Sequence, residues 1–354
     1  MRALIIGGTG LIGRAAAARL AAAGWQVDVT GRNCRHLPAA LAAAGVGFIE
    51  ADRADAGALA AALGGGADLL VDCVCFTAVD AAGLLPLARS ASSTVMISSK
   101  AVYVDAAGNH ANSDERPRFD GPITEHQPTM APSDIDYNSR QGYGANKVAA
   151  EQVLLDSGLP VTVLRPSKVH GAGANPPREW VFVKRVLDRR PAVILARRGT
   201  GVDHPSAAAN VAELILTAAH RPGRRVLNSA DPDAPNGLQI CRAIATHLGY
   251  EFEEVLLDEP TSADPATAGL GRHPWNAPFP IVLDMSAAAS LGYQAAGDYA
   301  ATVGAGVDWL VSAARGDEGR QVSEWLADSY FDSFFDYAAE DRYLAGSAAA
   351  VAGQ

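Results

Sequence analysis

Short apolar runs alternate with Ala-rich amphipathic stretches through the first half of the chain. This alternation is typical of repeated strand–helix units, in which helices cover both faces of a parallel sheet. Six apolar runs are predicted to be strands: residues 3–6, 26–30, 47–50, 68–74, 94–98 and 160–165. The predicted fold class is therefore α/β, with a doubly wound parallel sheet.

Two amphipathic stretches predict helices at the edge of this sheet. The first covers residues 11–23 and ends at Gly24, and the second covers 143–155 and ends at Ser157-Gly158. Residues 104–140 between them are polar, contain four prolines and show no period. We therefore predict a long loop there, and long loops in compact domains are often functional or mobile.

The alternation weakens after Arg165, where Pro and Gly recur. We predict that residues 1–165 form a first domain, to which 205–228 return. A smaller mixed domain is predicted from 166–204 and 229–330. Residues 331–354 are predicted to form a C-terminal helix and tail.

Composition and charge exclude several classes of protein. With 49% apolar and 19% charged residues among 354, the chain is globular. Its 29 basic and 39 acidic residues give a net charge of −10, which argues against a broad nucleic-acid-binding surface. No apolar stretch approaches membrane-spanning length and no signal peptide is evident, so we expect a cytoplasmic protein with no membrane partner.

Four cysteines are too few for a disulfide scaffold, and none has partner ligands at zinc-site spacing. Cys73 and Cys75 lie two residues apart in an apolar run, so we predict that both pack on one face of a strand and that the protein holds no metal. Lysine is also scarce, because only four of the 29 basic residues are lysines.

The segment Gly7-Gly8-Thr9-Gly10-Leu11-Ile12-Gly13 follows the first predicted strand and opens the first helix. Glycines at this point let the backbone turn sharply and approach a pyrophosphate, whose charge meets the helix N-terminus. The strand before and the helix after make this a dinucleotide-binding motif rather than a plain turn. The predicted cofactor contacts are Gly7, Thr9, Gly10, Leu11, Ile12 and Gly13.

The end of the second strand indicates which dinucleotide binds. NAD sites commonly place a carboxylate there for the ribose 2′-hydroxyl, whereas this chain has Thr30-Gly31-Arg32-Asn33. Arg32 can pair with a 2′-phosphate, so we predict NADP (as NADPH) over NAD; the alternative is that Arg32 is a solvated loop charge. Asp28 lies too early in the strand to serve the ribose. Asp52 and Arg53, after the third strand, are predicted to face the adenine.

Tyr143 and Lys147 are spaced i, i+4 on the second predicted helix, which puts them on one face. An ammonium beneath a phenol favours the ionised phenol, which can then exchange a proton near neutral pH. Ser98 and Ser99 follow the fifth strand, and a hydroxyl at the carboxyl end of a strand faces the crevice where ligands bind. Either serine can equally be a turn hydroxyl.

The motifs GGTGLIG, SSKAVY, YGANK and LRPSKVHG together resemble the extended short-chain dehydrogenase/reductase superfamily, the NAD(P)-dependent epimerase/dehydratase family, over about residues 1–220. The resemblance implies a Rossmann domain and hydride transfer at a carbinol or carbonyl carbon. It makes Ser99 the polarising hydroxyl, Tyr143 the acid/base and Lys147 its partner, which also holds the nicotinamide ribose. It also implies cofactor contacts at Val74, Cys75, Tyr143, Lys147 and Pro166. It further implies a homodimer through the helices that include 143–155, whose Ala-rich faces equally suit packing within one chain.

Several departures argue against a nucleotide-sugar enzyme. Lys100-Ala101 stand where dehydratases of this family carry an Asp-Glu pair, and Lys168 stands where many nucleotide-sugar members carry an asparagine. We therefore predict an NADPH-dependent reductase or dehydrogenase acting on a small, anionic or sugar-like metabolite. The predicted substrate contacts are Lys100, Lys168, His170 and Trp180, although a packed core is the alternative for the tryptophan.

Two other functions stay open: a nucleotide-sugar epimerase that retains its cofactor, and a non-catalytic dinucleotide-binding member of the superfamily. The intact Tyr-x-x-x-Lys pair argues against the second. A hydrolase has little support, because the chain has neither a G-x-S-x-G elbow nor an H-E-x-x-H helix.

Overall fold

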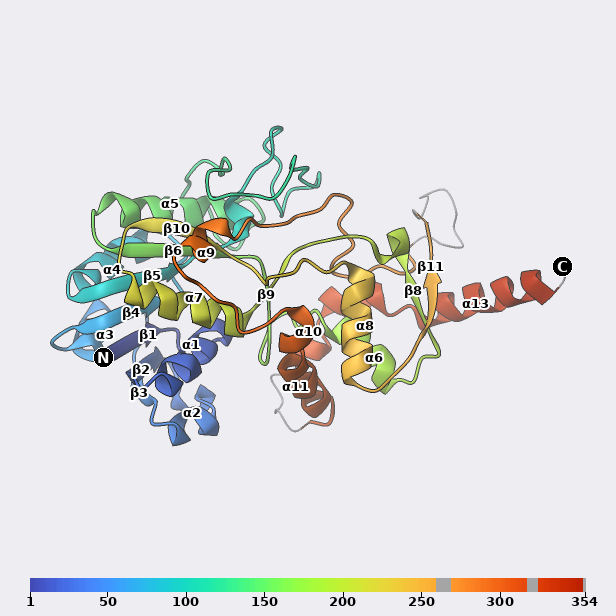
Figure 1. The fold of residues 1–354 in the computed structure, drawn as a ribbon, viewed down its shortest axis with the longest axis horizontal. Helices are drawn as coiled ribbons and strands as arrows, with labels where there is room; N and C mark the ends of the chain where they lie inside the picture. Colours follow the sequence, from blue (N-terminus) through green and yellow to red (C-terminus); the bar gives the residue numbers. More distant parts are fainter. Residues whose placement is uncertain (259–268, 317–323, 353–354) are drawn as a thin grey trace. The chain divides into compact units, whose positions relative to one another are not determined.

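The computed structural model describes residues 1–258, 269–316 and 324–352, with side chains described as far as residue 346 (Figure 1). The chain divides into two compact units. The first contains Met1–Val169, His204–Pro232 and Ile281–Asp298, and the second contains the described parts of His170–Asp203, Asp233–Pro280 and Tyr299–Gln354.

The first unit is built on a seven-stranded parallel sheet in the order β10-β6-β5-β4-β1-β2-β3 (Figure 1). Its strands are β1 (Arg2–Ile6), β2 (Gln26–Gly31), β3 (Gly47–Glu50), β4 (Ala67–Asp72), β5 (Ala91–Ile97), β6 (Val161–Pro166) and β10 (Arg225–Ser229). The six strands predicted from apolar runs are confirmed, each within a few residues at either end. The strand β10 was not predicted.

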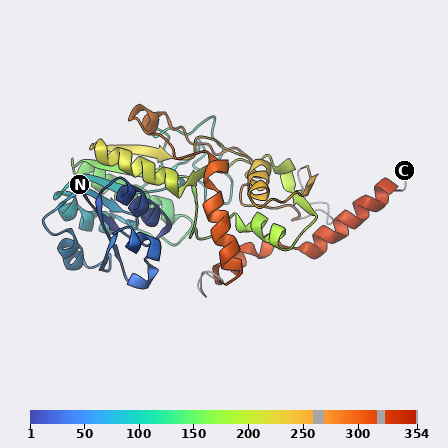
Figure 2. The ribbon, with the colours of Figure 1, turned by 60° about the horizontal axis from the view of Figure 1, so that its bottom comes forward.

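Helices cover both faces of the sheet. Successive side chains of a strand point to opposite faces, so apolar residues at consecutive positions need a cover on each side. Ala3 and Ile5 of β1 belong to one core cluster, whose helices are α1 (Leu11–Ala22) and α7 (Ala208–His220), side by side in Figures 1 and 2. Leu4 and Ile6 belong to the other cluster, with the helices α3 (Ala56–Leu63), α4 (Ala78–Ala88) and α5 (Gly142–Asp156). The doubly wound fold is confirmed. Shorter helices of this unit are α2 (Ala39–Ala43) and α9 (Ser286–Ser290).

The assignment of residues 281–298 to the second domain is wrong. The backbone of Ile123 pairs with this segment, donating its N–H to Val282 O at 2.8 Å and accepting from Asp284 N at 2.9 Å. The side chain of Asn210 on α7 also accepts a hydrogen bond from Ala296 N at 2.7 Å. These contacts tie the segment to the sheet-bearing unit.

Cys73 and Cys75 do not share a strand face, because β4 ends at Asp72. Cys73 packs beside the core cluster of α1 and Cys75 lies in the cluster of α4. Burial raises the pKa of both thiols, that of Cys75 to about 12. Both side chains are packing groups, as predicted.

The second unit is smaller and mixed, as predicted. A two-stranded parallel ladder joins β8 (Ala192–Leu195) to β11 (Glu253–Leu256). Its helices are α6 (Trp180–Leu187), α8 (Gly237–His247), α10 (Tyr299–Thr302), α11 (Gly304–Ala314) and α13 (Tyr337–Ala352). The start of α13 is held by Glu340, which accepts from Arg185 on α6 at 2.6 Å.

Within the described residues, no helix has both the length and the apolar character needed to cross a membrane.

A second two-stranded sheet pairs β7 (Lys168–His170) with β9 (Pro205–Ala207). Beside it, Lys168 N donates a hydrogen bond to His204 O at 3.2 Å.

Candidate active site

The glycine-rich loop has the geometry of a phosphate cradle. Gly7 has a φ of +75°, which favours glycine, and a Cβ on Gly13 would lie 2.5 Å from Gly7 O, so α1 packs directly on the loop. A Cβ on Gly10 would meet nothing nearer than 3.5 Å. Gly8 is restricted like Gly13, because a Cβ there would lie 2.3 Å from Val29 Cβ. Gly7, Gly8 and Gly13 are therefore required by the fold, while Gly10 keeps the N-terminus of α1 open to an approaching anion.

Past β2 the chain presents a basic surface without a carboxylate. Arg32 is exposed at the end of the strand, and Asn33 accepts a hydrogen bond from Arg35 N at 2.9 Å to begin a short 3₁₀ turn. Asp28 forms an ion pair with Arg2 at 3.0 Å. The Asp28 carboxylate of β2 is thus paired with Arg2, and Arg32 is the exposed cation at the end of this strand.

The two residues predicted to face the adenine have different surroundings. Asp52 is exposed and accepts a hydrogen bond from Ala54 N at 2.8 Å. The guanidinium of Arg53 instead forms an ion pair at 2.8 Å with Asp72, the last residue of β4. Burial raises the pKa of the Asp72 carboxyl, and the charge of Arg53 acts in the opposite direction. Arg53 is therefore engaged within the protein.

Lys147 is buried at the carboxyl edge of the sheet, with 2% of its surface exposed. Its Nζ donates to Cys75 O at 2.7 Å and to Ile97 O at 2.9 Å. It also lies 4.3 Å from the centre of the Phe76 ring, a cation–π contact. The ammonium is thus fixed between the ends of β4 and β5.

Tyr143 and Ser99 come from segments that pack on each other. Tyr143 is half-buried in the first turn of α5, and a Cβ on the next residue, Gly144, would lie 2.6 Å from Ala101 O. Ala101 belongs to the 3₁₀ turn η2 (Lys100–Val102), which Ser99 caps by accepting from Ala101 N at 3.1 Å. The close approach at Gly144 brings the two segments together.

The neighbouring serine is engaged differently. Ser98 is buried and its hydroxyl donates to the carboxylate of Glu151. Glu151 lies four residues beyond Lys147 and also accepts from Arg165 at 3.1 and 2.5 Å. No motif predicted this buried network, although the 143, 147, 151 spacing that continues the Tyr–Lys face is visible in the sequence.

The segment after the fifth strand packs against the same network. Tyr103 lies with its ring 4.8 Å from the guanidinium carbon of Arg165, and its hydroxyl donates to Asn228 at 2.6 Å. Burial raises the pKa of Tyr103 to about 12. This tyrosine is a structural group of the site's floor.

The long loop between Ser99 and α5 is tied to the site. Asn146 on α5 donates to Ile135 O at 2.6 Å, and His110 bonds with Gln141 at 3.0 Å. The ring of Tyr137 stacks on Phe76, with centroids 5.4 Å apart and planes 19° apart. The loop therefore places the Tyr137 ring on the Phe76 ring, which in turn contacts the Lys147 ammonium.

The predicted substrate residues divide between the two units. Lys100 is buried at the start of η2 and Lys168 is half-buried at the start of β7. His170 is buried beside Tyr299, with ring centroids 4.8 Å apart. Trp180 lies in the core of the second unit, which favours the packed alternative.

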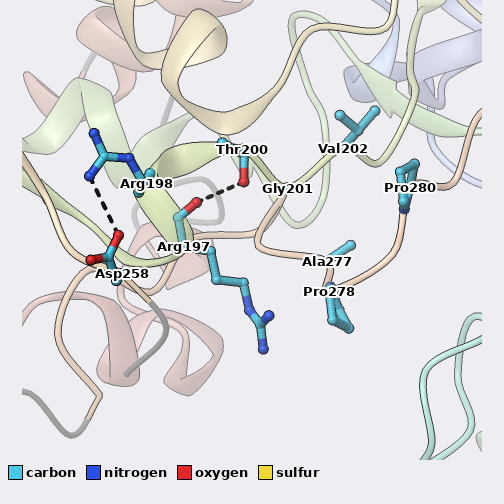
Figure 3. A pocket seen from close by; sticks show the side chains of 9 residues that line it. All are labelled: Arg197, Arg198, Thr200, Gly201, Val202, Asp258, Ala277, Pro278 and Pro280. Carbon is cyan, nitrogen blue, oxygen red and sulfur yellow. Dashed lines mark hydrogen bonds and ion pairs between the residues drawn. The ribbon is translucent and has the colours of Figure 1, made fainter. Parts of the chain in front are cut away.

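A pocket of about 430 Å³ lies in the second unit beside the turn after β8 (Figure 3). Arg197 and Arg198 on its wall have φ values of 52° and 53°, in the left-handed region that non-glycine residues rarely adopt. Arg198 pairs with Asp258 at 3.4 Å, and the hydroxyl of Thr200 donates to Arg197 O at 2.8 Å (Figure 3). No sequence motif indicated this pocket.

Fold and site together define a nucleotide-cofactor enzyme of the Rossmann type: a parallel sheet, a glycine loop before α1 and a buried lysine one helical turn from a tyrosine. The described residues hold no group of three metal-ligating side chains. The model of the NAD dependent epimerase/dehydratase family matches residues 3–225. The chain belongs to this family, whose members are NAD-dependent enzymes, as the sequence resemblance implied.

Solved structures of several sugar-nucleotide enzymes are similar in fold. A dTDP-glucose 4,6-dehydratase from Bacillus anthracis in complex with NAD is 14% identical, with a TM-score of 0.65, covering 91% of this chain and 99% of that chain. A UDP-glucose-4-epimerase from Stenotrophomonas maltophila with bound NAD and formylated UDP-arabinopyranose is 19% identical, with a TM-score of 0.66, covering 89% and 99%.

A UDP-glucuronic acid 4-epimerase from Bacillus cereus, also in complex with NAD, is 16% identical, with a TM-score of 0.62, covering 88% of this chain and 100% of that chain. A search of curated protein sequences found none that matches this chain. The likeness of fold therefore extends over both units, beyond the part that the family model matches.

Proposed function

We propose that the protein is an NADPH-dependent reductase or dehydrogenase that acts on a carbonyl or hydroxyl carbon of a small, anionic or sugar-like metabolite. The observation that carries this proposal is the fixed ammonium of Lys147, held by two backbone carbonyls one helical turn from Tyr143. A lysine fixed in this way carries its charge on the same helix face as the phenol, which is the group proposed to exchange a proton with the substrate oxygen.

The residues present fit a dinucleotide. The N-terminus of α1 and Gly10 would receive the pyrophosphate, Asp52 the adenine amino group and Arg32 a 2′-phosphate. Two of the three N–H groups of Lys147 are used by the protein, which leaves one for a ribose hydroxyl. When bound, the nicotinamide supplies or accepts a hydride.

The chain's own groups would then handle the oxygen and its proton. In reduction, Ser99 donates a hydrogen bond to the substrate carbonyl oxygen and Tyr143 gives it a proton. In oxidation, the phenolate of Tyr143 removes the hydroxyl proton. The half-buried position of Tyr143 is compatible with both a substrate contact and restricted access of water.

The test of this function is a spectrophotometric assay of the purified protein with NADPH and a panel of aldehydes, ketones and keto sugars. We expect the nicotinamide absorbance to fall with at least one carbonyl compound. Substrate-dependent interconversion of sugar epimers without any change in this absorbance would contradict a net reductase.

The preference for NADP gives a separate prediction. Replacing Arg32 with Ala removes one charge-assisted contact to the 2′-phosphate, so NADPH should bind about 10- to 100-fold more weakly while NADH affinity stays the same. Fluorescence titration of both cofactors measures the change. Arg89→Ala, an exposed arginine beyond α4, is the matched control. Equal affinities of the wild-type protein for NADPH and NADH would contradict the preference.

Lys168 gives a prediction about the substrate. If its ammonium contacts an anionic group, Lys168→Met should raise the KM about tenfold or more, the worth of one hydrogen bond to a charged group, without changing NADPH affinity. Steady-state kinetics measures both constants. An unchanged KM would contradict a substrate contact and leave Lys168 with a structural role.

A nucleotide-sugar epimerase with retained cofactor is the second candidate function, because several of the similar structures are epimerases in complex with NAD. Such an enzyme should release bound oxidised cofactor on denaturation and show no net turnover of added NADPH. The cofactor content of the freshly purified protein separates the two candidates.

Assembly is a further proposal. We propose a homodimer through the helices that include α5, as the family resemblance implies. The inner face of α5 is already used within the chain, because Ala150 and Leu154 lie in the core cluster below it. The cytoplasmic location stays a prediction from sequence.

A further inference from the structure

Lys147 owes its position to the turn that follows β4. The carbonyl of Cys75 accepts from its Nζ at 2.7 Å, and the ring of the next residue, Phe76, lies 4.3 Å away. Both contacts come from residues 75–76, outside any helix or strand. Whatever holds this turn in place also holds the ammonium.

Two carboxylates bind the backbone of the turn from its two ends. Asp72, on the β4 side, accepts from Val74 N at 2.9 Å. Asp80, on the α4 side, accepts from Phe76 N and Thr77 N, both at 2.9 Å. The N–H groups on either side of Cys75 are therefore fixed by side chains.

Arg53 joins the two ends. Its Nη2 donates to Asp72 at 2.8 Å and to Asp80 O at 2.7 Å, and its Nε lies 3.7 Å from the Asp80 carboxylate. Arg53 follows β3, although β1 and β2 separate β3 from β4 in the sheet. It therefore reaches across the carboxyl edge to close a clamp around the turn.

The charges in this region also fit a clamp. Asp72 is fully buried, so its charge is compensated by the guanidinium of Arg53. Burial raises the pKa of the Asp72 carboxyl, and the charges of Arg53 and of Lys147, a second buried cation, act in the opposite direction. Loss of Arg53 leaves the buried Asp72 carboxylate without its ion-pair partner, and loss of the Asp72 charge releases one end of the bridge that Arg53 forms to Asp80, so either change should loosen the turn between them.

We propose that Arg53 and Asp72 are positioning residues for Lys147: by clamping the turn 73–77 they fix the carbonyl of Cys75 and the ring of Phe76 against the ammonium. This inference rests on the proposed function only for its effect on turnover. The placement of the lysine is testable without a substrate.

The scarcity of lysine makes the test simple. The chain has four lysines, so amine acetylation followed by peptide mass spectrometry reports each one separately: Lys100, Lys147, Lys168 and Lys184. In the wild-type protein Lys147 should react slowly, because it is buried and bound to two carbonyls. Lys184, with 32% of its side chain exposed, is the internal reference.

Two variants open the clamp in different ways. Arg53→Met removes the bridge, whereas Asp72→Asn keeps an acceptor for Val74 N and removes only the charge. In both, local opening should speed acetylation of Lys147 relative to Lys184 by about tenfold. Arg2→Met is the matched control, since Arg2 also bonds to an aspartate and to the carbonyls of Ala62, Leu63 and Gly66, but from the first residue of β1 at the opposite edge.

Turnover separates a positioning role from a purely structural one. A misplaced lysine should lower kcat by about ten- to hundredfold and shift the pH profile of kcat. NADPH binding should weaken by no more than about tenfold, the loss of the one hydrogen bond proposed between Lys147 and a ribose hydroxyl. Compared with Arg53→Met, the conservative variant Arg53→Lys should restore part of kcat and part of the wild-type pH profile. Unchanged acetylation of Lys147 in Arg53→Met and Asp72→Asn would overturn the clamp. Faster acetylation in a protein that shows no redox activity would instead keep the clamp and contradict the proposed function.

Discussion

Tyr143→Phe is expected to lower kcat by about 10²- to 10⁴-fold, the usual contribution of a positioned general acid/base. The substitution removes one oxygen and keeps the ring, so the first turn of α5 and its contact with η2 stay intact. NADPH affinity should change little, because the ring of Tyr143 and the other predicted cofactor contacts, Lys147 among them, are kept. Single-turnover kinetics with NADPH and a carbonyl substrate measures the effect.

Tyr137→Phe is the matched control for this experiment. The ring of Tyr137 stacks on Phe76, the residue whose ring contacts Lys147. The Tyr137 hydroxyl takes no part in this stack. We expect near wild-type turnover from Tyr137→Phe. Comparable losses in the two variants would show that the Tyr143 hydroxyl has no special part in the reaction.

Glu151→Ala should reduce the free energy of unfolding by about 3–5 kcal/mol, the cost of breaking a buried ion pair from one side. Arg165 would lose both of its bonds to this carboxylate, at 3.1 and 2.5 Å, and Ser98 would lose its acceptor. Both members of the pair are buried, with side-chain exposures of 7% and 3%. Urea unfolding followed by circular dichroism measures the change.

Glu254→Ala supplies the comparison at an exposed pair. Its partner Arg242 is 59% exposed, so this substitution should cost only about 0–1 kcal/mol. If the two variants were equally stable, the network beneath Lys147 would contribute no more than a surface ion pair, and its proposed role as the floor of the site would fail.

The sheet was predictable where burial imposes an unbroken apolar run. Central strands such as β4, with Leu69, Leu70 and Val71, are covered on both faces and read clearly in the sequence. β10 lies at the edge of the sheet, and its sequence RVLNS mixes polar and apolar residues, so no run marks it. The segment 281–298 was misassigned because backbone pairing with Ile123 leaves no pattern in side chains.

The candidate site was predictable only as far as motifs reach. Spacing placed Tyr143 and Lys147 on one helix face, but the carbonyls that hold the ammonium lie 72 and 50 residues away along the chain. The same limit explains why the role of Arg53 was not predicted. Its place after the third strand suggested a cofactor contact, while its partner Asp72 comes from a strand that is not adjacent in the sheet.

The long loop shows a third case. Its prolines and lack of period correctly indicated a segment without regular helix or strand, and its length suggested a role at the site. Its attachment depends on single polar contacts, such as Asn146 to Ile135 O and His110 to Gln141. No repeating pattern encodes such contacts, so only the structure shows that Tyr137 reaches Phe76.

Transfer of deuterium from NADPH labelled at nicotinamide C4 tests the central claim most directly. The protein, labelled NADPH and a carbonyl substrate are incubated together, and the product is analysed by mass spectrometry. With both C4 hydrogens replaced by deuterium, we predict one deuterium in each product molecule for each NADP⁺ formed. Over the same time, the Tyr143→Phe variant should form at least about 100-fold less labelled product. Conversion of the substrate with no deuterium in the product and no NADP⁺ formed would contradict the proposed net reduction.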